Sequence, residues 1–291
     1  MAQHHSISKE STMTVHTSRP TTLVLGGTGK TGRRVAQRLT ALDLPVRIGT
    51  RAGGVPFDWE DPETWEPALE GMTAAYISYQ PDLAAPGAVE AIASFSQLAV
   101  DRGVRRLVLL SGRGEAEAQA CEKALTDSGA DTTILRASWF GQNFSEGYLL
   151  EPILAGQVYL PAGDIPEPFV DVDDIADVAL AALTQPGHTG EIYELTGPRA
   201  ITFAEAIATI AAAAGRTVDY VQVPAADFAA GLAAEQVPAD VIELLTYLFT
   251  TVLDGRNVNP GNGVERALGR APRDFAEYAA SAAATGIWNV G

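Results

Sequence analysis

The stretch TTLVLGGTGKTG, residues 21–32, decides the fold of this chain. Its apolar start is rich in strand formers, and the segment after the glycines has Val35, Leu39 and Leu42 at helical spacing. A tight turn with spare glycines is the simpler alternative. However, a strand, a glycine loop and a helix in this order form a dinucleotide-binding unit, because the glycines let the backbone approach a pyrophosphate and the helix N-terminus offers free N–H groups. The predicted contacts are Gly26, Thr28, Gly29, Lys30, Thr31 and Gly32.

The end of the second predicted strand selects the form of the dinucleotide. The strand Pro45–Arg51 ends about twenty residues beyond the loop, where a site specific for NAD usually has an Asp or Glu on the ribose 2′-hydroxyl. This chain has Thr50 and Arg51 there. A guanidinium binds a 2′-phosphate through charge-assisted hydrogen bonds, whereas a carboxylate repels it. Arg51 therefore predicts NADP(H), assisted by Lys30 or Arg33, with a solvated surface arginine as the alternative.

Strands and helices continue to alternate after this unit. Strand-like runs are predicted at Val55–Trp59, Ala74–Ser78, Arg106–Leu110 and Thr132–Leu135, and an amphipathic helix at Pro86–Arg102. This order predicts an α/β fold with a Rossmann-type, doubly wound parallel sheet, in which ligands bind outside the carboxyl ends of the strands. Besides the glycine loop, we expect that crevice to contain Arg51, Asp58 near the adenine, Tyr79, Gln80, Pro81, Ser111 and Ala137–Phe140.

The composition excludes several classes of protein. The 291 residues carry 20 Lys and Arg against 36 Asp and Glu, a net charge of −16, so we expect no nucleic-acid partner. No apolar run is long enough to span a membrane, and the single cysteine, Cys121, excludes an internal disulfide framework. His188 is the only histidine outside residues 1–20, so neither a Ser-His-Asp hydrolase nor a metal site is expected.

The domain organisation is also predicted from the sequence. Residues 1–20 are polar and without apolar periodicity, which is typical of a disordered leader or a tag, and the absence of a secretory signal favours a cytoplasmic location. We expect an NADP-binding domain over 21–150 and a smaller, mostly helical part over 151–291 that is interleaved with the sheet. The expected partner is a small-molecule substrate, with no membrane partner, and the chain is expected to be a monomer or a homodimer.

Several segments together resemble the NmrA-like, atypical short-chain dehydrogenase/reductases. They are Leu25–Gly32, Phe57–Trp59, Leu109–Ser111, Leu135–Phe144 and Phe169–Ala176. Within that group, the segments at 57–59 and 139–144 are most similar to the festuclavine/agroclavine dehydrogenases of ergot alkaloid biosynthesis and their bacterial relatives. The resemblance runs from Thr21 to Ala283, and it implies a Rossmann domain, a smaller C-terminal part over the crevice, and NADP(H). The chain departs from it at Ala137, where related chains commonly have proline.

The same resemblance indicates that the usual catalytic dyad is missing. Ordinary short-chain dehydrogenases use Tyr-x-x-x-Lys, and many relatives have a Glu-x-x-Leu pattern after it that Glu122 and Leu125 fit. The dyad positions are then Gly114 and Ala118, which cannot donate a proton. Reduction of an iminium carbon neutralises a positive charge that is already present, and solvent can protonate the product of quinone reduction. Neither reaction therefore depends on a strong acid in the protein. The sequence therefore favours hydride transfer to a preactivated acceptor.

Few polar side chains remain as catalytic candidates. Ser111 and Tyr79 are expected beside the nicotinamide, although Ser111 equally fits a turn serine and Tyr79 fits packing against the cofactor. Lys123 is interpreted as a surface residue. The apolar stretch Val241–Val252 is the candidate for a lid or a dimer surface, with ordinary core as the alternative. Aromatic residues expected on the substrate side, again with core packing as the alternative, are Trp139, Phe140, Phe144 and Tyr148.

Two functions are consistent with this sequence. The first is an NADPH-dependent reductase of an imine, iminium, quinone or similarly electrophilic acceptor. The second is an NADP(H)-binding redox sensor or regulator without turnover, as some NmrA-like proteins are believed to be. A nucleotide-sugar epimerase is disfavoured, because that chemistry depends on the Tyr/Lys pair.

Overall fold

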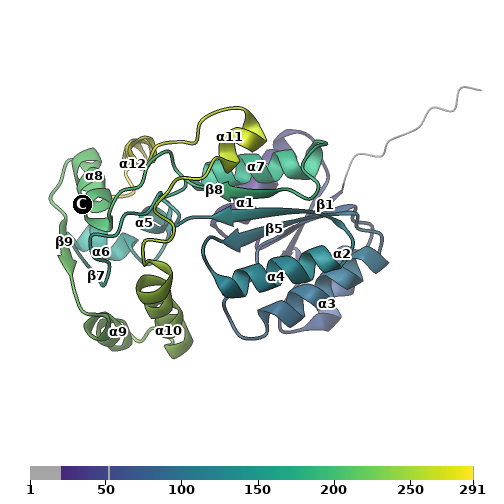
Figure 1. Ribbon diagram of the computed structural model, residues 1–291, viewed down its shortest axis with the longest axis horizontal. Coiled ribbons are helices and arrows are strands. Elements are labelled where there is room, and N and C mark those ends of the chain that lie inside the picture. Colours follow the sequence, from purple (N-terminus) through teal and green to yellow (C-terminus); the bar gives the residue numbers. More distant parts are fainter. Residues whose placement is uncertain (1–20, 52, 291) are drawn as a thin grey trace, which may run out of the picture.

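The body of the protein is a parallel sheet with helices on both faces, and a second, mostly helical part lies beside it (Figure 1). This computed structural model describes residues 21–51 and 53–290. The leader predicted at residues 1–20 lies outside them. The strand order is β3-β2-β1-β4-β5-β6-β8, and every neighbouring pair is parallel, which confirms the predicted fold class. The strands are β1 (Thr22–Leu25), β2 (Val46–Thr50), β3 (Val55–Pro56), β4 (Ala74–Ile77), β5 (Arg106–Gly112), β6 (Asp131–Ala137) and β8 (Ile192–Leu195).

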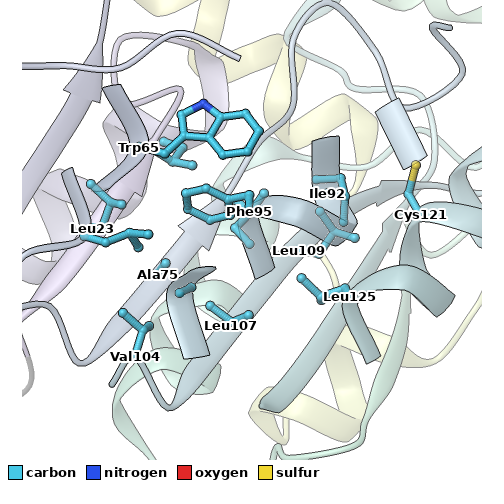
Figure 2. Close-up of a cluster of buried hydrophobic side chains, with 14 of the residues drawn as sticks. Leu23, Trp65, Ala75, Ile92, Phe95, Val104, Leu107, Leu109, Cys121 and Leu125 are labelled. Atoms are coloured by element: carbon cyan, nitrogen blue, oxygen red, sulfur yellow. The ribbon is translucent and has the colours of Figure 1, made fainter. Parts of the chain in front are cut away.

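Both faces of the sheet are buried, which explains why its central strands are continuously apolar. Successive residues of a strand point to opposite faces, so Leu23 and Leu25 pack with α2, α3 and α4, whereas Val24 packs with α1 and α7. Figure 2 shows the first layer, in which Trp65 and Phe95 lie near Leu23 with ring centroids 5.9 Å apart. These helices are α1 (Lys30–Ala41), α2 (Trp65–Leu69), α3 (Ala88–Asp101), α4 (Ala116–Asp127) and α7 (Val172–Thr184).

The third strand is shorter than expected. The predicted strand Val55–Trp59 is reduced to Val55–Pro56, a short strand at the edge of the sheet, where a proline without an N–H is tolerated. Phe57 then turns into the core beside Trp65, and Trp59 packs edge-on against Phe57 with ring centroids 4.9 Å apart. A 3-10 turn, η1 (Pro62–Thr64), follows and leads into α2.

The second part has its own core, built around buried aromatic side chains that include Phe144, Phe169, Phe203 and Phe275. Two parallel strands pair within it. The chain enters this part after β6, returns to the sheet for α7 and β8, and leaves it again, so the two parts are interleaved in sequence. Its elements are α5 (Asn143–Glu146), α6 (Leu150–Ala155), β7 (Gln157–Leu160), α8 (Phe203–Ala214), β9 (Asp219–Gln222), α9 (Ala225–Ala234), α10 (Ala239–Tyr247), the π-helical turn η2 (Leu248–Val252) and α12 (Phe275–Ala284); α11 (Gly263–Leu268) packs on α7 and β8 instead.

None of the helices in the described ranges combines the length and the apolar character that a membrane crossing requires.

Candidate active site

Two adjoining cavities lie at the carboxyl ends of the sheet strands. The cavity that contains Ser111, here called the serine cavity, has a volume of about 320 Å³, and the cavity that contains Arg51, the arginine cavity, has about 380 Å³. Gly29, Gln80 and Pro81 line both, so the two are continuous along the glycine loop and the end of β4. The structure thus brings together the loops that follow β1, β2, β4, β5 and β6.

The glycine loop is shaped by backbone contacts that leave no room for side chains. A Cβ on Gly32 would overlap the carbonyl oxygen of Gly26 and lie 2.9 Å from the Cα of Gly27, while Gly26 itself has a left-handed φ of +65°. Gly29 directly precedes α1 and has no side chain with which to cap the helix. Within the described residues, the first N–H of α1 that donates to a carbonyl oxygen is that of Arg33, which donates to Gly29 O at 3.2 Å. The N–H groups of the first turn of α1 therefore remain available to an anion.

The cations near this loop are divided between the cavities. Lys30 lines the serine cavity, and burial lowers the pKa of its ammonium. In the part of the chain that the structure describes, that ammonium has neither a hydrogen-bond nor an ion-pair partner. Arg51 is exposed on the lining of the arginine cavity, beside Asp58. The expectation that Arg33 assists Arg51 finds no support, because the guanidinium of Arg33 is paired with Glu146 and lines neither cavity.

Ser111 lines the serine cavity, but its hydroxyl hydrogen is already used. The Oγ donates to Oε1 of buried Glu122 at 2.6 Å. Arg136 holds the same carboxylate with Nε at 2.8 Å and Nη2 at 2.6 Å. Ser111 is therefore a member of an ion-paired network beneath the cavity, and it is not a free proton source. Tyr79 also lines the cavity; its ring packs on Trp59 with centroids 4.8 Å apart, and burial raises the pKa of its hydroxyl.

The aromatic residues expected on the substrate side separate into two groups. Trp139 and Phe140 line the serine cavity, and Trp139 packs on Phe249 with ring centroids 4.7 Å apart. Phe144 lies instead in the second core, fully buried, and Tyr148 is 37% exposed on the surface; neither lines a cavity. The prediction that Phe144 and Tyr148 contact substrate is not supported, because Phe144 packs within the second core and Tyr148 is absent from the lining of both cavities.

Three acidic residues that the sequence did not identify as site residues line the serine cavity. Asp82, Glu115 and Glu167 all line it. Glu167 is 1% exposed, its Oε1 has no hydrogen-bond partner among the residues that the structure describes, and burial raises its pKa to about 7. In sequence these are isolated acidic residues in loops or at the start of a helix, and such residues usually belong to a solvated surface. Of the three, only Glu115 has a sequence feature that could have indicated a place in the site, because it closely follows the end of a buried strand. Among residues 21–51 and 53–290, no group of His, Cys, Asp and Glu is arranged to hold a metal ion.

The apolar stretch predicted as a lid or a dimer surface, Val241–Val252, lies over the serine cavity, and the residue directly before it reaches the arginine cavity. Leu248 and Val252 of η2 line the serine cavity, and Asp240 of α10 lines the arginine cavity. Hydrogen bonds hold this segment to the start of α4: Tyr247 Oη donates to Glu117 Oε2 at 2.9 Å, and Arg256 Nη1 donates to Gly114 O at 2.9 Å. The C-terminal part therefore covers the crevice of the sheet.

Comparisons with known proteins agree on one family. Residues 117–279 match the NmrA-like family. The chain is 32% identical to the uncharacterized oxidoreductase YesF of Bacillus subtilis (91% of this chain, 97% of that protein) and 32% identical to an agroclavine dehydrogenase of Claviceps fusiformis (89% and 96%). It is 30% identical to an NAD(P)H azoreductase of Xenophilus azovorans (90% and 98%).

A solved structure of similar fold is the triphenylmethane reductase of Citrobacter sp., crystallised with NADP(H). Its TM-score is 0.73 at 19% identity, over 90% of this chain and 99% of that one.

Proposed function

This chain is an oxidoreductase of the NmrA-like family, and we propose that it is an NADPH-dependent reductase that delivers hydride to a preactivated acceptor such as an imine, an iminium ion or a quinone. Full-length relatives named as an agroclavine dehydrogenase and an azoreductase support a reductase of this kind. The bound dihydronicotinamide would supply the hydride. The protein would bind, orient and shield the reactants.

The unpaired ammonium of Lys30 is the observation that carries this proposal. The ammonium is partly buried, and Glu146, the carboxylate whose charge acts on it, is itself paired with Arg33 and Arg34. An anion bound at the site would therefore offset the cost of removing the ammonium from water. Lys30 begins α1, whose first N–H groups have no hydrogen-bond acceptor within residues 21–51 and 53–290, and Gly29 before it lines both cavities. A pyrophosphate held there would extend its adenosine half into the arginine cavity and its nicotinamide half into the serine cavity. Arg51 and Asp58 line the first of these.

The serine cavity has the character expected of an acceptor site. Trp139 and Phe140 offer flat apolar surfaces, and Leu248 and Val252 cover them with aliphatic side chains. These groups would exclude water from the reacting atoms and hold a planar acceptor by stacking. Ser111, held by Glu122, would position the coenzyme through its oxygen, and Tyr79 and Gln80 would complete the lining next to it.

Reversing the charge of Arg51 should separate the two coenzymes. In Arg51→Asp, the affinity for NADPH should fall roughly 100-fold, because a carboxylate replaces the guanidinium that would bind the 2′-phosphate. The affinity for NADH should change less than about threefold, since NADH has no phosphate at that position. Calorimetric titration of both coenzymes measures the effect. Equal losses for both would contradict the assignment of Arg51.

The proposed activity is tested by following NADPH absorbance with a panel of iminium, quinone, azo and enone compounds. We expect turnover with at least one class. Tight binding of NADPH with no turnover on any compound would overturn the proposal in favour of a coenzyme-binding sensor.

A further inference from the structure

Two carboxyl groups face each other in the serine cavity. Glu115, directly before α4, is 7% exposed and lines the cavity, and its carboxylate lies against Gly112 at the end of β5. Its Oε2 has no hydrogen-bond donor in reach among the described residues. Asp82, in the loop after β4, lines the same cavity, and its carboxyl forms a side-chain hydrogen bond with that of Glu115. Two carboxyl groups form a hydrogen bond only when one of them carries a proton.

The surroundings assign that proton to Glu115. Asp82 Oδ1 accepts the N–H of Ala84 at 2.9 Å, a contact that stabilises its ionised form. Burial, followed by the charge and hydrogen bond of Asp82, raises the pKa of Glu115 to about 8. Burial also raises the pKa of Asp82. Glu115 is thus a buried acid that keeps its proton at neutral pH, and the partly exposed Asp82 connects it to solvent.

We propose that the Asp82–Glu115 pair is the proton donor of this enzyme, and this inference rests on the proposed reductase function. As hydride bonds to the electrophilic atom of a neutral acceptor, the π electrons of the C=O, C=N or N=N bond move to the second atom. That atom takes the proton of Glu115, so the acceptor is reduced by one hydride and one proton. The pair is left as two carboxylates and regains a proton from water through Asp82.

The position of the pair explains how the chain manages without the usual dyad. The predicted dyad position Gly114 faces away from the cavity, since a Cβ there would lie 2.7 Å from the side chain of Asn257, and Ala118 is fully buried. Glu115, one residue further, is the side chain that lines the cavity. Other titratable and charged groups surround the pair. They are Glu117 and Cys121 of α4, Tyr247 of α10, the Asp254–Arg256 ion pair beside Gly114, and, in the serine cavity itself, Lys30, Tyr79, Arg113 and Glu167.

The test compares a neutral acceptor, which needs a proton, with an iminium acceptor, which does not. In Glu115→Gln, kcat for the neutral azo compound should fall roughly 100-fold, while reduction of an iminium compound should stay within about threefold. Wild-type turnover of the neutral acceptor should fall as pH rises through the raised pKa of Glu115. This decrease at high pH should be absent from Glu115→Gln. In Asp82→Asn the decrease in turnover should occur at lower pH, because the carboxylate of Asp82, which raises the pKa of Glu115, has been removed. Glu235→Gln, an exposed change at the end of α9, is the matched control and should behave as wild type.

A readout without coenzyme keeps the inference independent of turnover. Infrared difference spectra of the free protein should show a protonated carboxyl that titrates with the raised pKa of Glu115. This part of the signal should be lost in Glu115→Gln, while the contribution of the buried carboxyl of Glu167 should remain. Equal losses on neutral and iminium acceptors, or a missing carboxyl signal, would overturn the pair as proton donor while leaving the reductase function in place. A wild-type protein with the carboxyl signal and no turnover on any acceptor would instead overturn the reductase function, and the donation step with it.

Discussion

Replacing Gly32 with alanine should reduce the affinity for NADPH at least 100-fold, equivalent to about 2.7 kcal/mol of binding free energy. The physical reason is the overlap of the new Cβ with the carbonyl oxygen of Gly26, which is backbone and has no side-chain rotamer to move aside. The loop must shift to accommodate the methyl group, and the N–H groups at the start of α1 move with it. Calorimetric titration with NADPH measures the loss.

The matched control is Gly231→Ala, the same chemical change in an exposed turn of α9. A Cβ there meets no atom within 4 Å, and alanine is the better helix former by about 0.5–1 kcal/mol. Coenzyme affinity should be unchanged and the melting temperature equal or slightly higher. If Gly32→Ala binds NADPH as well as Gly231→Ala does, the glycine loop is not the pyrophosphate site.

Replacing Glu122 with alanine should lower the free energy of unfolding by about 3 kcal/mol. Glu122 is buried between α4 and the sheet, where it accepts hydrogen bonds from Ser111 and Arg136. Removal of one partner leaves the guanidinium of Arg136 partly buried with Glu194 3.9 Å away as its remaining carboxylate. Equilibrium unfolding in urea measures the change, and a loss of the serine's orientation should also weaken coenzyme binding.

Lys123→Ala on the same helix is the control for this variant. Lys123 is 75% exposed, and its pair with Asp127 is a surface pair one helical turn away. Such pairs contribute less than about 1 kcal/mol, so stability should change by about 0.5 kcal/mol or less. Comparable losses in the two variants would show that the buried network does not stabilise the protein.

Relatives that act on chemically different acceptors are consistent with a cavity that combines apolar walls and a buried acid. The sequence identity of this chain is 32% to the protein named as an agroclavine dehydrogenase and 30% to the protein named as an azoreductase. Apolar groups such as Trp139 and Leu248 impose few directional requirements on an acceptor, whereas the carboxyl of Glu115, if it is the proton donor as proposed, would determine whether a neutral acceptor can be protonated. Differences in acceptor among such proteins would then depend on few side chains.

Local patterns were sufficient to predict the framework of this protein. The glycine loop, the helical spacing of Val35 and Leu39, and the apolar strands predicted the βα units, and alternation predicted a parallel sheet, which the structure confirms. These features depend on neighbours in sequence, because glycine conformation, strand alternation and helix periodicity are local properties of the chain. The same patterns placed the crevice at the carboxyl ends of the strands.

Which side chains meet in that crevice was decided by tertiary packing. The sequence motif around Trp139–Phe144 does not reveal that Phe144 turns into a separate core while Trp139 lines the cavity. Nor does it reveal that Glu122 accepts the hydrogen of Ser111, or that Asp82 and Glu115, from loops after different strands, face each other. The pKa of a carboxyl depends on burial and on charges brought near it by distant parts of the chain, so only the folded structure distinguishes these acids from ordinary surface residues.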